Sequence, residues 1–469
     1  MKEDRLQDRQ LNSSLTVPRE LGWTGALLVA FVVLLGYGGT SLLTGQTSTR
    51  QHAYFDHLAV AFLDGRLDLT NPPGHSDLTP HDGKWYVPFP PLVAGLMLPW
   101  IAVFGLANMN SVWFSILFGV LNVALLARIL DELARRCWIA LGVGSRVWLL
   151  ALFAFGYLHW QVAIEGSVWF LSHTCTVTFI ALAVWLALKC KRPWLPALAL
   201  ALAIWGRPTV LFTWPLLAGI VAQKLHDRRA QASVPPREDM ASANPFHATA
   251  DSGTGCDASI LPAMLRWSVL SALPLLVSIA GMAGYNYARF QNIFDFGYGR
   301  QKIDTEVVGD LSRGQFHIHH IPLNVHVLLF GRPIWHPSER HPDWRLPVPD
   351  DHGLSLFLAT PAFLYVFRVR PRRTAPDPHA APSAFSRPRI LLASSWLAIG
   401  LTLVPLLLYY NTGWRQFGYR FSLDFIIPLM ILLAVACGSR TTRGFRVLVV
   451  LGMLVNAWGI VWWYTKWLD

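Results

Sequence analysis

Five aspartates lie in one stretch, residues 45–110, which follows the first long apolar run of the sequence: Asp56, Asp64, Asp68, Asp77 and Asp82. A carboxylate can act as a general base if it reaches an acceptor hydroxyl. A position just outside a bilayer partly desolvates such a group, and this raises its pKa toward the range that suits a base. We therefore expect this stretch to carry chemistry.

Two of the five aspartates are candidate bases. Asp56 lies on a helix predicted over FDHLAVAFLDG, and Asp77 lies in an irregular segment before a Gly-Lys-Trp-Tyr turn. Asp64 precedes Gly65 and Asp82 precedes Gly83, which indicates a helix end and a turn. Either Asp56 or Asp77 is expected to be the base.

Cationic side chains in later polar segments could hold a phosphate. A guanidinium matches phosphate oxygens bidentately, and the positive-inside rule gives an outer loop little other reason to collect arginine. Asp424 lies just inside an apolar run and is expected to pair with Arg415 or Arg420, because an unpaired charge there is costly. The candidate phosphate ligands are Arg415, Arg420, Arg300 and Arg207.

Other polar side chains of these segments are candidate substrate contacts. In the sequence FHIHH, an extended backbone would place His317 and His319 on one face. No metal-binding spacing of histidines occurs in residues 45–110, so the sequence indicates no metal, and no cofactor is required. The candidate contacts are Lys84, Tyr86, Glu165, Tyr298, His317 and His319.

The composition is that of an integral membrane protein. Of 469 residues, 53% are hydrophobic and only 14% are charged, and long apolar runs recur along the whole chain. The formal charge of +11 lies mostly in short loops, where the positive-inside rule places it, so we expect no nucleic-acid partner.

The apolar runs predict an all-α chain of about eleven transmembrane helices, with the N-terminus in the cytoplasm. The run at 88–104 could cross the bilayer, but the basic loop around Arg128 and Arg146 would then lie outside, so an interfacial position is favoured. The expected spans are 21–44, 111–130, 147–163, 172–188, two within 194–221, 267–287, 353–367, 390–409, one ending near Cys437, and 447–463. The run at 194–221 is divided into two spans because the sequence Trp205-Gly206-Arg207-Pro208 breaks it.

The segments between the spans complete a single-domain organisation over 1–469. The cytoplasmic parts are a leader at 1–20, a flexible loop at 224–266 and a basic linker at 368–389, while outer loops span 45–110 and 288–352.

This layout resembles that of the GT-C superfamily of membrane glycosyltransferases, which includes protein O-mannosyltransferases and aminoarabinose transferases. The likeness is carried by the run from Pro90-Pro91-Leu92 to Phe104-Gly105 and by the sequences NYARFQNIFDFGYG and GWRQFGYRFSLDF. The resemblance implies sugar transfer from a polyprenyl-phosphate carrier, with an aspartate of the first loop as base. The family often has an Asp-Glu pair soon after its first span, and here Arg50 and Gln51 stand there.

The resulting hypothesis is an inverting glycosyltransferase of the cytoplasmic membrane, with its active site on the outer face. Its partners would be a polyprenyl-phosphate sugar donor, membrane lipids, and a lipid, glycan or protein acceptor that the sequence does not identify. The alternatives are a polytopic transporter or lipid flippase, marked by internal repeats and charges at the bilayer midplane, and a non-catalytic relative.

Overall fold

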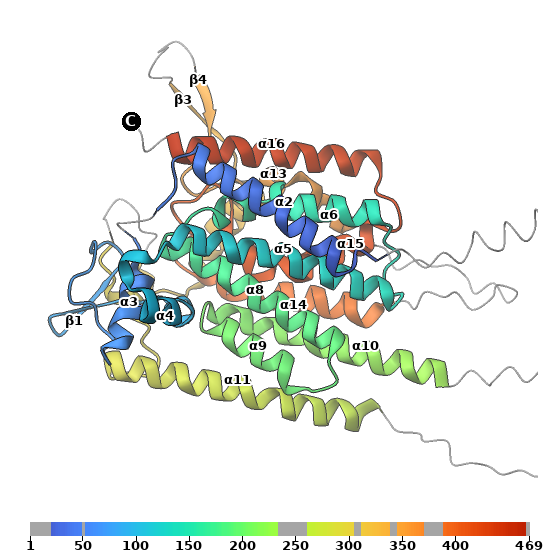
Figure 1. Cartoon of the computed structure of the whole chain (residues 1–469), viewed down its shortest axis with the longest axis horizontal. Coiled ribbons are helices and arrows are strands. Elements are labelled where there is room, and N and C mark those ends of the chain that lie inside the picture. The colour runs from blue at the N-terminus through green and yellow to red at the C-terminus, as the bar shows by residue number, and fades with distance from the viewer. Residues whose placement is uncertain are drawn as a thin grey trace, which may run out of the picture.

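The computed structural model shows a bundle of roughly parallel helices with smaller elements at one end (Figure 1). It describes residues 20–48, 52–232, 260–303, 311–337, 345–369 and 388–465. Among these residues, seven helical segments are long and apolar enough to cross a membrane. They are α2 (Gly22–Leu43), α5 (Ser111–Arg135), α8 (Val168–Lys189), α11 (Ile260–Phe290), α14 (Arg389–Leu408), η7 with α15 (Arg420–Phe425 and Ile426–Cys437), and α16 (Arg443–Thr465).

The remaining four expected spans are shorter or broken, so the count of eleven is not confirmed. The run at 147–163 forms α6 (Val143–Phe155) and α7 (His159–Ala163). The run at 194–221 forms α9 (Trp194–Ile204), η2 (Pro208–Thr213) and α10 (Trp214–Ala232). The expected span at 353–367 is only a short helix, α13 (Leu356–Ala359), followed by the 3-10 segment η6 (Pro361–Arg368).

The bundle has two ends, which we name the leader end and the loop end. At the leader end, where α2 begins, the amide N–H of Ile390 donates to the Gln223 side chain and that of Gly142 to the Ser439 carbonyl. These bonds bring the ends of α10 and α15 beside the starts of α14 and α6. The loop end carries the small elements (Figure 1).

The first polar stretch folds as separate small elements at the loop end. They are α3 (Tyr54–Leu63), a hairpin of β1 (Thr79–His81) and β2 (Lys84–Tyr86), α4 (Leu92–Phe104) and the 3-10 turn η1 (Leu106–Asn108). The predicted helix end at Asp64 and turn at Asp82 are confirmed. With 13 residues, α4 is shorter than the roughly 20 residues that a spanning helix needs.

The second polar stretch adds short elements only. They are η3 (Tyr298–Arg300), η4 (Leu311–Arg313), η5 (Ile318–His320), α12 (Ile321–Phe330) and a hairpin of β3 (Ile334–Pro337) with β4 (Arg345–Val348). The leader, the middle of the 224–266 loop and most of the 368–389 linker lie outside the described residues. The loop boundaries were partly wrong, because α10 continues to Ala232 and α11 begins at Ile260.

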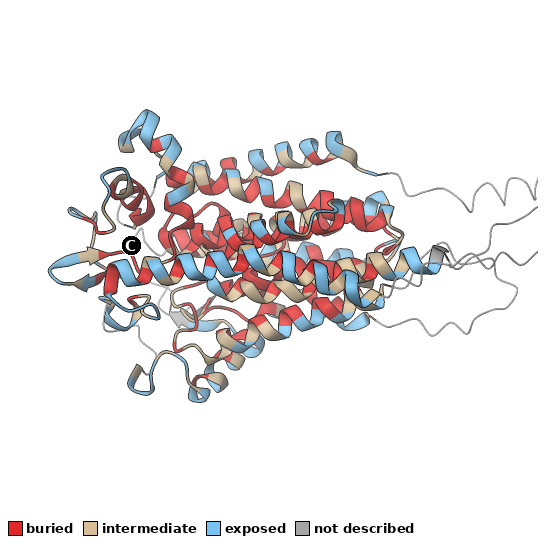
Figure 2. Ribbon diagram, turned by 90° about the horizontal axis from the view of Figure 1, so that it is seen from below, coloured by how far each residue is buried: buried red, intermediate tan, exposed pale blue. Residues whose placement is uncertain are grey.

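Apolar side chains cover much of the outward surface of the bundle. Buried residues fill its middle, and exposed residues face outward (Figure 2). On α2, Leu27 and Phe31 are 66% and 57% exposed, and on α11, Leu273 is 63% exposed. A surface of this kind suits lipid and not water, since water-exposed apolar patches of such size are rare.

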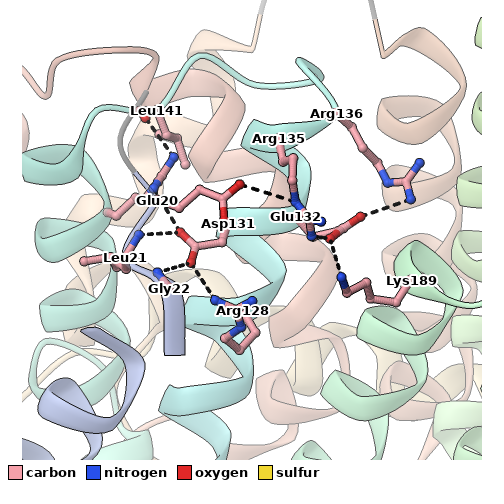
Figure 3. Close-up of polar contacts among 11 residues, drawn as sticks. Glu20, Leu21, Gly22, Arg128, Asp131, Glu132, Arg135, Arg136, Leu141 and Lys189 are labelled. Carbon is pink, nitrogen blue, oxygen red and sulfur yellow. Dashed lines mark hydrogen bonds and ion pairs between the residues drawn. The ribbon is translucent and has the colours of Figure 1, made fainter. Parts of the chain in front are cut away.

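A buried network of charges fixes the leader end (Figure 3). The Asp131 carboxylate on α5 accepts hydrogen bonds from Arg128 and Arg146, each at 2.9 Å, and from the amide N–H groups of Leu21 and Gly22. Asp131 and Arg146 have no exposed surface. The neighbouring Glu132 pairs with Arg135, Arg136 and Lys189. These bonds hold the start of α2 against α5 and α6.

We expect Asp131→Asn to lower the free energy of unfolding by about 3 kcal/mol or more, because it leaves two buried guanidinium groups without a full counter-charge. The exposed ion pair of Asp64 with Arg66 gives a matched control, and Asp64→Asn should cost less than about 1 kcal/mol. Thermal unfolding in detergent, followed by tryptophan fluorescence, compares the two variants. Equal melting temperatures would contradict the structural role of Asp131.

Candidate functional site

The candidate site includes the break between α9 and η2. Arg207 lies in this break, directly before η2. Gly206 lies so close to α8 that a Cβ there would collide with Thr176, and its carbonyl accepts a hydrogen bond from Ser172. Pro208 then starts η2, which suits a residue with a fixed φ and no amide N–H. The break predicted at residues 205–208 is confirmed, and it aims Arg207 toward η7.

Asp424 of η7 binds Arg207. The Arg207 Nε donates to Asp424 Oδ1 at 2.6 Å, and the Thr209 hydroxyl donates to Oδ2 at 2.6 Å. The His173 Nδ1 lies 3.3 Å from Oδ1. The expected pairing of Asp424 with Arg415 or Arg420 was therefore wrong: the helix break delivers Arg207 to Asp424, and this arginine satisfies the carboxylate.

Arg420, at the start of η7, is a buried cation without a carboxylate partner among the described residues. It is 8% exposed, and it forms no ion pair with any described residue. Its Nη1 donates to the Arg415 carbonyl at 3.0 Å, while its Nε has no hydrogen-bond partner within the described chain. The guanidinium lies over the rings of Phe170 and Phe421 and within electrostatic range of Arg207. This arrangement leaves donor capacity for an anion.

The two polar loops join beside these arginines. The Asp77 amide N–H donates to the Lys302 carbonyl at 2.7 Å, and the Gln301 side chain donates to Asp77 Oδ1 at 2.9 Å. The charge of Asp77 acts on Arg420 and on the hydroxyls of Tyr298 and Tyr410. Asp77 therefore lies within electrostatic range of Arg420, and Tyr298 within electrostatic range of Asp77 and Arg207.

The Tyr298 hydroxyl lies within electrostatic range of two arginines, Arg207 and Arg289. Burial raises the pKa of this hydroxyl to about 12, with Arg207 and Arg289 opposing this effect. The Arg207, Arg420, Asp77 and Tyr298 predictions therefore fall in one neighbourhood, which we name the arginine cluster and which also includes Asp424. Tyr409 and Tyr410, just after α14, border it.

Arg289 was missed by the sequence reasoning. It ends α11, where a cation usually marks a membrane boundary, yet it is only 3% exposed. It donates to the Val87 carbonyl and to Asn286, each at 2.8 Å, and pairs with no carboxylate of the described chain. The sequence signal was its place in NYARFQNIFDFGYG, one of the segments that carried the resemblance.

Asp56 lies on α3 as predicted, but it is not tied to the arginine cluster by a hydrogen bond or an ion pair. It is 6% exposed, and its Oδ1 has no hydrogen-bond partner in the described chain. Burial raises the pKa of its carboxyl to about 7, against a smaller opposing effect of its own amide N–H. A carboxyl group whose pKa lies near neutrality suits proton transfer at neutral pH.

Other predicted ligands have partners of their own. Arg300 pairs with Asp295 at 2.6 Å, and the Arg415 Nε lies 3.4 Å from Asp351. Lys84 lies 3.4 Å from Asp68. Tyr86 is buried against Phe290, and burial raises the pKa of its hydroxyl. Of these four predicted ligands, Arg415 alone contacts the arginine cluster, through its carbonyl.

Glu165 bonds the last helix of the bundle. It is buried before α8 and accepts hydrogen bonds from the Trp463 indole at 3.3 Å and the Tyr464 hydroxyl at 3.2 Å. Burial raises the pKa of its carboxyl. These contacts give Glu165 a structural role in docking α16.

The expected shared face of His317 and His319 was wrong. Residues 318–320 form the 3-10 turn η5, and the His317 Nδ1 accepts the His319 amide N–H at 3.1 Å. The extended backbone on which the shared face depended occurs only at His317, and the His317 and His319 rings instead lie 6.3 and 6.1 Å from the His320 ring. No group of three His, Cys, Asp or Glu in the described ranges could hold a metal ion.

Comparisons with protein-family models, curated proteins and solved structures found no match to this chain. The site is therefore interpreted from its own chemistry. Within the described ranges it offers two buried arginines without carboxylate partners, Arg289 and Arg420, and a third that Asp424 neutralises, Arg207. The first polar stretch adds the carboxyl groups of Asp56 and Asp77.

We expect the stability of the chain to fall as pH rises from about 4 to about 7, because the folded state holds the Asp56 proton over this range and the unfolded state does not. Asp56→Asn should reduce this dependence by the contribution of Asp56, which is at most about 4 kcal/mol, and should leave the contribution of Glu165, whose carboxyl pKa burial also raises. Melting temperatures in detergent across this range measure it.

Asp64→Asn is the control for the pH series, because it removes an exposed carboxylate next to the end of the same helix. It should leave the slope of melting temperature against pH unchanged. A wild-type slope that survives in Asp56→Asn would show that Asp56 does not take up the proton.

Proposed function

We propose that this chain is a membrane glycosyltransferase that takes a sugar from a polyprenyl-phosphate donor and transfers it to an acceptor on the outer face of the cytoplasmic membrane. The observation that carries the proposal is Arg420, a buried guanidinium with unused donor capacity and no carboxylate partner in the described chain. A buried cation of this kind is costly unless an anion binds it.

A phosphate leaving group fits the arginine cluster because its charge increases during the reaction. Arg420 and Arg207 lie within electrostatic range of each other, so an anion between them relieves their repulsion. In sugar transfer from a lipid phosphate, negative charge grows on the departing phosphate. Fixed guanidinium groups stabilise that charge without reorganising.

The proposed base is an aspartate of the loop end. Asp77 is the first candidate and Asp56 is the second. The carboxylate of Asp77 lies within electrostatic range of Arg420 and Tyr298, and this range supports Asp77 as the base of a phosphate-leaving reaction. An acceptor hydroxyl between Asp77 and the sugar would lose its proton to Asp77 as it attacks. The sugar–phosphate bond breaks as the new bond forms, and the configuration at the sugar carbon inverts.

The exposed apolar faces of the bundle support a donor with a long lipid tail, because the tail can remain in the membrane while its phosphate reaches the cluster. The loop end would face outward under the positive-inside rule, since the leader end carries Arg128, Arg135, Arg136, Arg146 and Lys189.

A carrier-lipid transporter is the second candidate. The break between α9 and η2, which places Arg207 beside Asp424, is the observation that favours it, because transporters bind substrates at broken helices. Transport would move the phosphate without transferring the sugar. An assay of sugar transfer therefore distinguishes a glycosyltransferase from a transporter.

We expect Asp77→Asn and Arg420→Gln each to lower sugar transfer about 100-fold or more, because they remove the base and a charge-stabilising donor. The assay measures radiolabel passed from polyprenyl-phosphate hexoses and pentoses to endogenous acceptors in membranes carrying the chain. Arg300→Gln is the control, since Arg300 is paired with Asp295 and should be dispensable.

A large loss in Asp56→Asn with normal activity in Asp77→Asn would move the base to α3. Undiminished activity in both aspartate variants would remove the first loop as the source of the base. Normal activity in Arg420→Gln would contradict the phosphate site.

A further inference from the structure

A cavity of about 490 Å³ lies at the leader end, on the opposite side of the bundle from the arginine cluster. Its walls come from the end of α8, the segment leading into α9, the second half of α10 and the start of α11. Among the described residues, five cations line it and no carboxylate does: Lys191, Arg192, Lys224, Arg228 and Arg266.

The positive charge of this cavity is not neutralised within the described chain. The nearby Glu132 forms its ion pairs with Arg135, Arg136 and Lys189. None of the five lining cations forms an ion pair with a described residue. Lys224 donates to the carbonyl oxygens of Ala187 and Cys190, which end α8. Burial, with repulsion from Arg136 and Arg228, lowers the pKa of Lys224 to about 8.

The cavity also has an apolar side. Trp267 is buried in its wall and stacks on Trp214, with the ring centroids 5.8 Å apart. Leu270 lines the cavity and is 41% exposed. It belongs to α11, whose neighbouring Leu265 and Val269 are 63% and 64% exposed. The cationic lining is therefore continuous with an apolar face suited to acyl chains.

We infer that this cavity binds the phosphate headgroup of an anionic membrane lipid, with the acyl chains lying along α11. The cations supply charge and hydrogen bonds to the phosphate oxygens, and cationic clusters at this depth attract anionic headgroups. A soluble phosphate would use the same cations, but it would gain nothing from Leu270 and the exposed face of α11. The apolar wall thus favours a lipid.

The test is a titration of the full chain, purified in a neutral detergent, with dioleoyl phosphatidylglycerol, followed by native mass spectrometry. Dioleoyl phosphatidylcholine provides the zwitterionic comparison, and inorganic phosphate is added as a competitor. The variant is Arg228→Gln with Arg266→Gln, two exposed lining residues. The matched control is Arg440→Gln with Arg443→Gln, exposed at the same end but outside the cavity lining.

The cavity variant should weaken phosphatidylglycerol binding at least about tenfold, while the control stays within about twofold of wild type. Phosphatidylcholine binding should not change, and millimolar phosphate should not displace the lipid. Equal lipid binding by both variants would overturn the inference. Displacement by phosphate, with no preference for phosphatidylglycerol, would assign the cavity to a soluble anion instead.

Melting temperatures check that the variants are folded. If the double variant unfolds, the single change Arg266→Gln is compared with Arg443→Gln, and at least about a threefold weakening is expected. Because the cavity lies far from the arginine cluster, sugar transfer in the cavity variant reports separately on the proposed activity.

Discussion

The ion pair between Asp424 and Arg207 determines the chemistry of the loop end. It joins the break after α9 to the start of η7, and Thr209 completes the bonding of the carboxylate. Because Arg207 and Thr209 satisfy Asp424, Arg420 four residues earlier keeps an uncompensated charge among the described residues. Burying such a charge costs stability, and a bound anion would recover that cost.

Buried charges are paired with opposite charges at the leader end, whereas two buried arginines at the loop end have no carboxylate partner among the described residues. At the leader end, Asp131 accepts from two arginines and two amide N–H groups, so the acid is fully satisfied and the network is structural (Figure 3). At the loop end, Arg289 and Arg420 bond carbonyl or amide oxygens and meet no carboxylate in the described chain. The paired charges of the leader end hold helices together, whereas the unpaired arginines of the loop end are where we propose that an anion binds.

Local features of the chain were predictable, and long-range pairings were not. Apolar run length located α2, α5, α8 and α14, and the Gly206-Arg207-Pro208 sequence located the helix break. Sequence neighbours suggested Arg420 for Asp424, but the true partner is 217 residues away, a distance that no local pattern encodes. Periodicity likewise failed at His317 and His319, because a single 3-10 turn reorients a side chain without leaving a sequence signal.

Equilibrium binding of geranylgeranyl phosphate to the purified chain tests the central claim most directly, with geranylgeraniol as the uncharged comparison. Wild type should bind the phosphate at least about tenfold more tightly than the alcohol, since a charge-assisted contact adds about 1.5–3 kcal/mol. Arg420→Gln should abolish that preference, and Arg300→Gln should keep it. An undiminished preference in Arg420→Gln would contradict the assignment of the arginine cluster as a phosphate site.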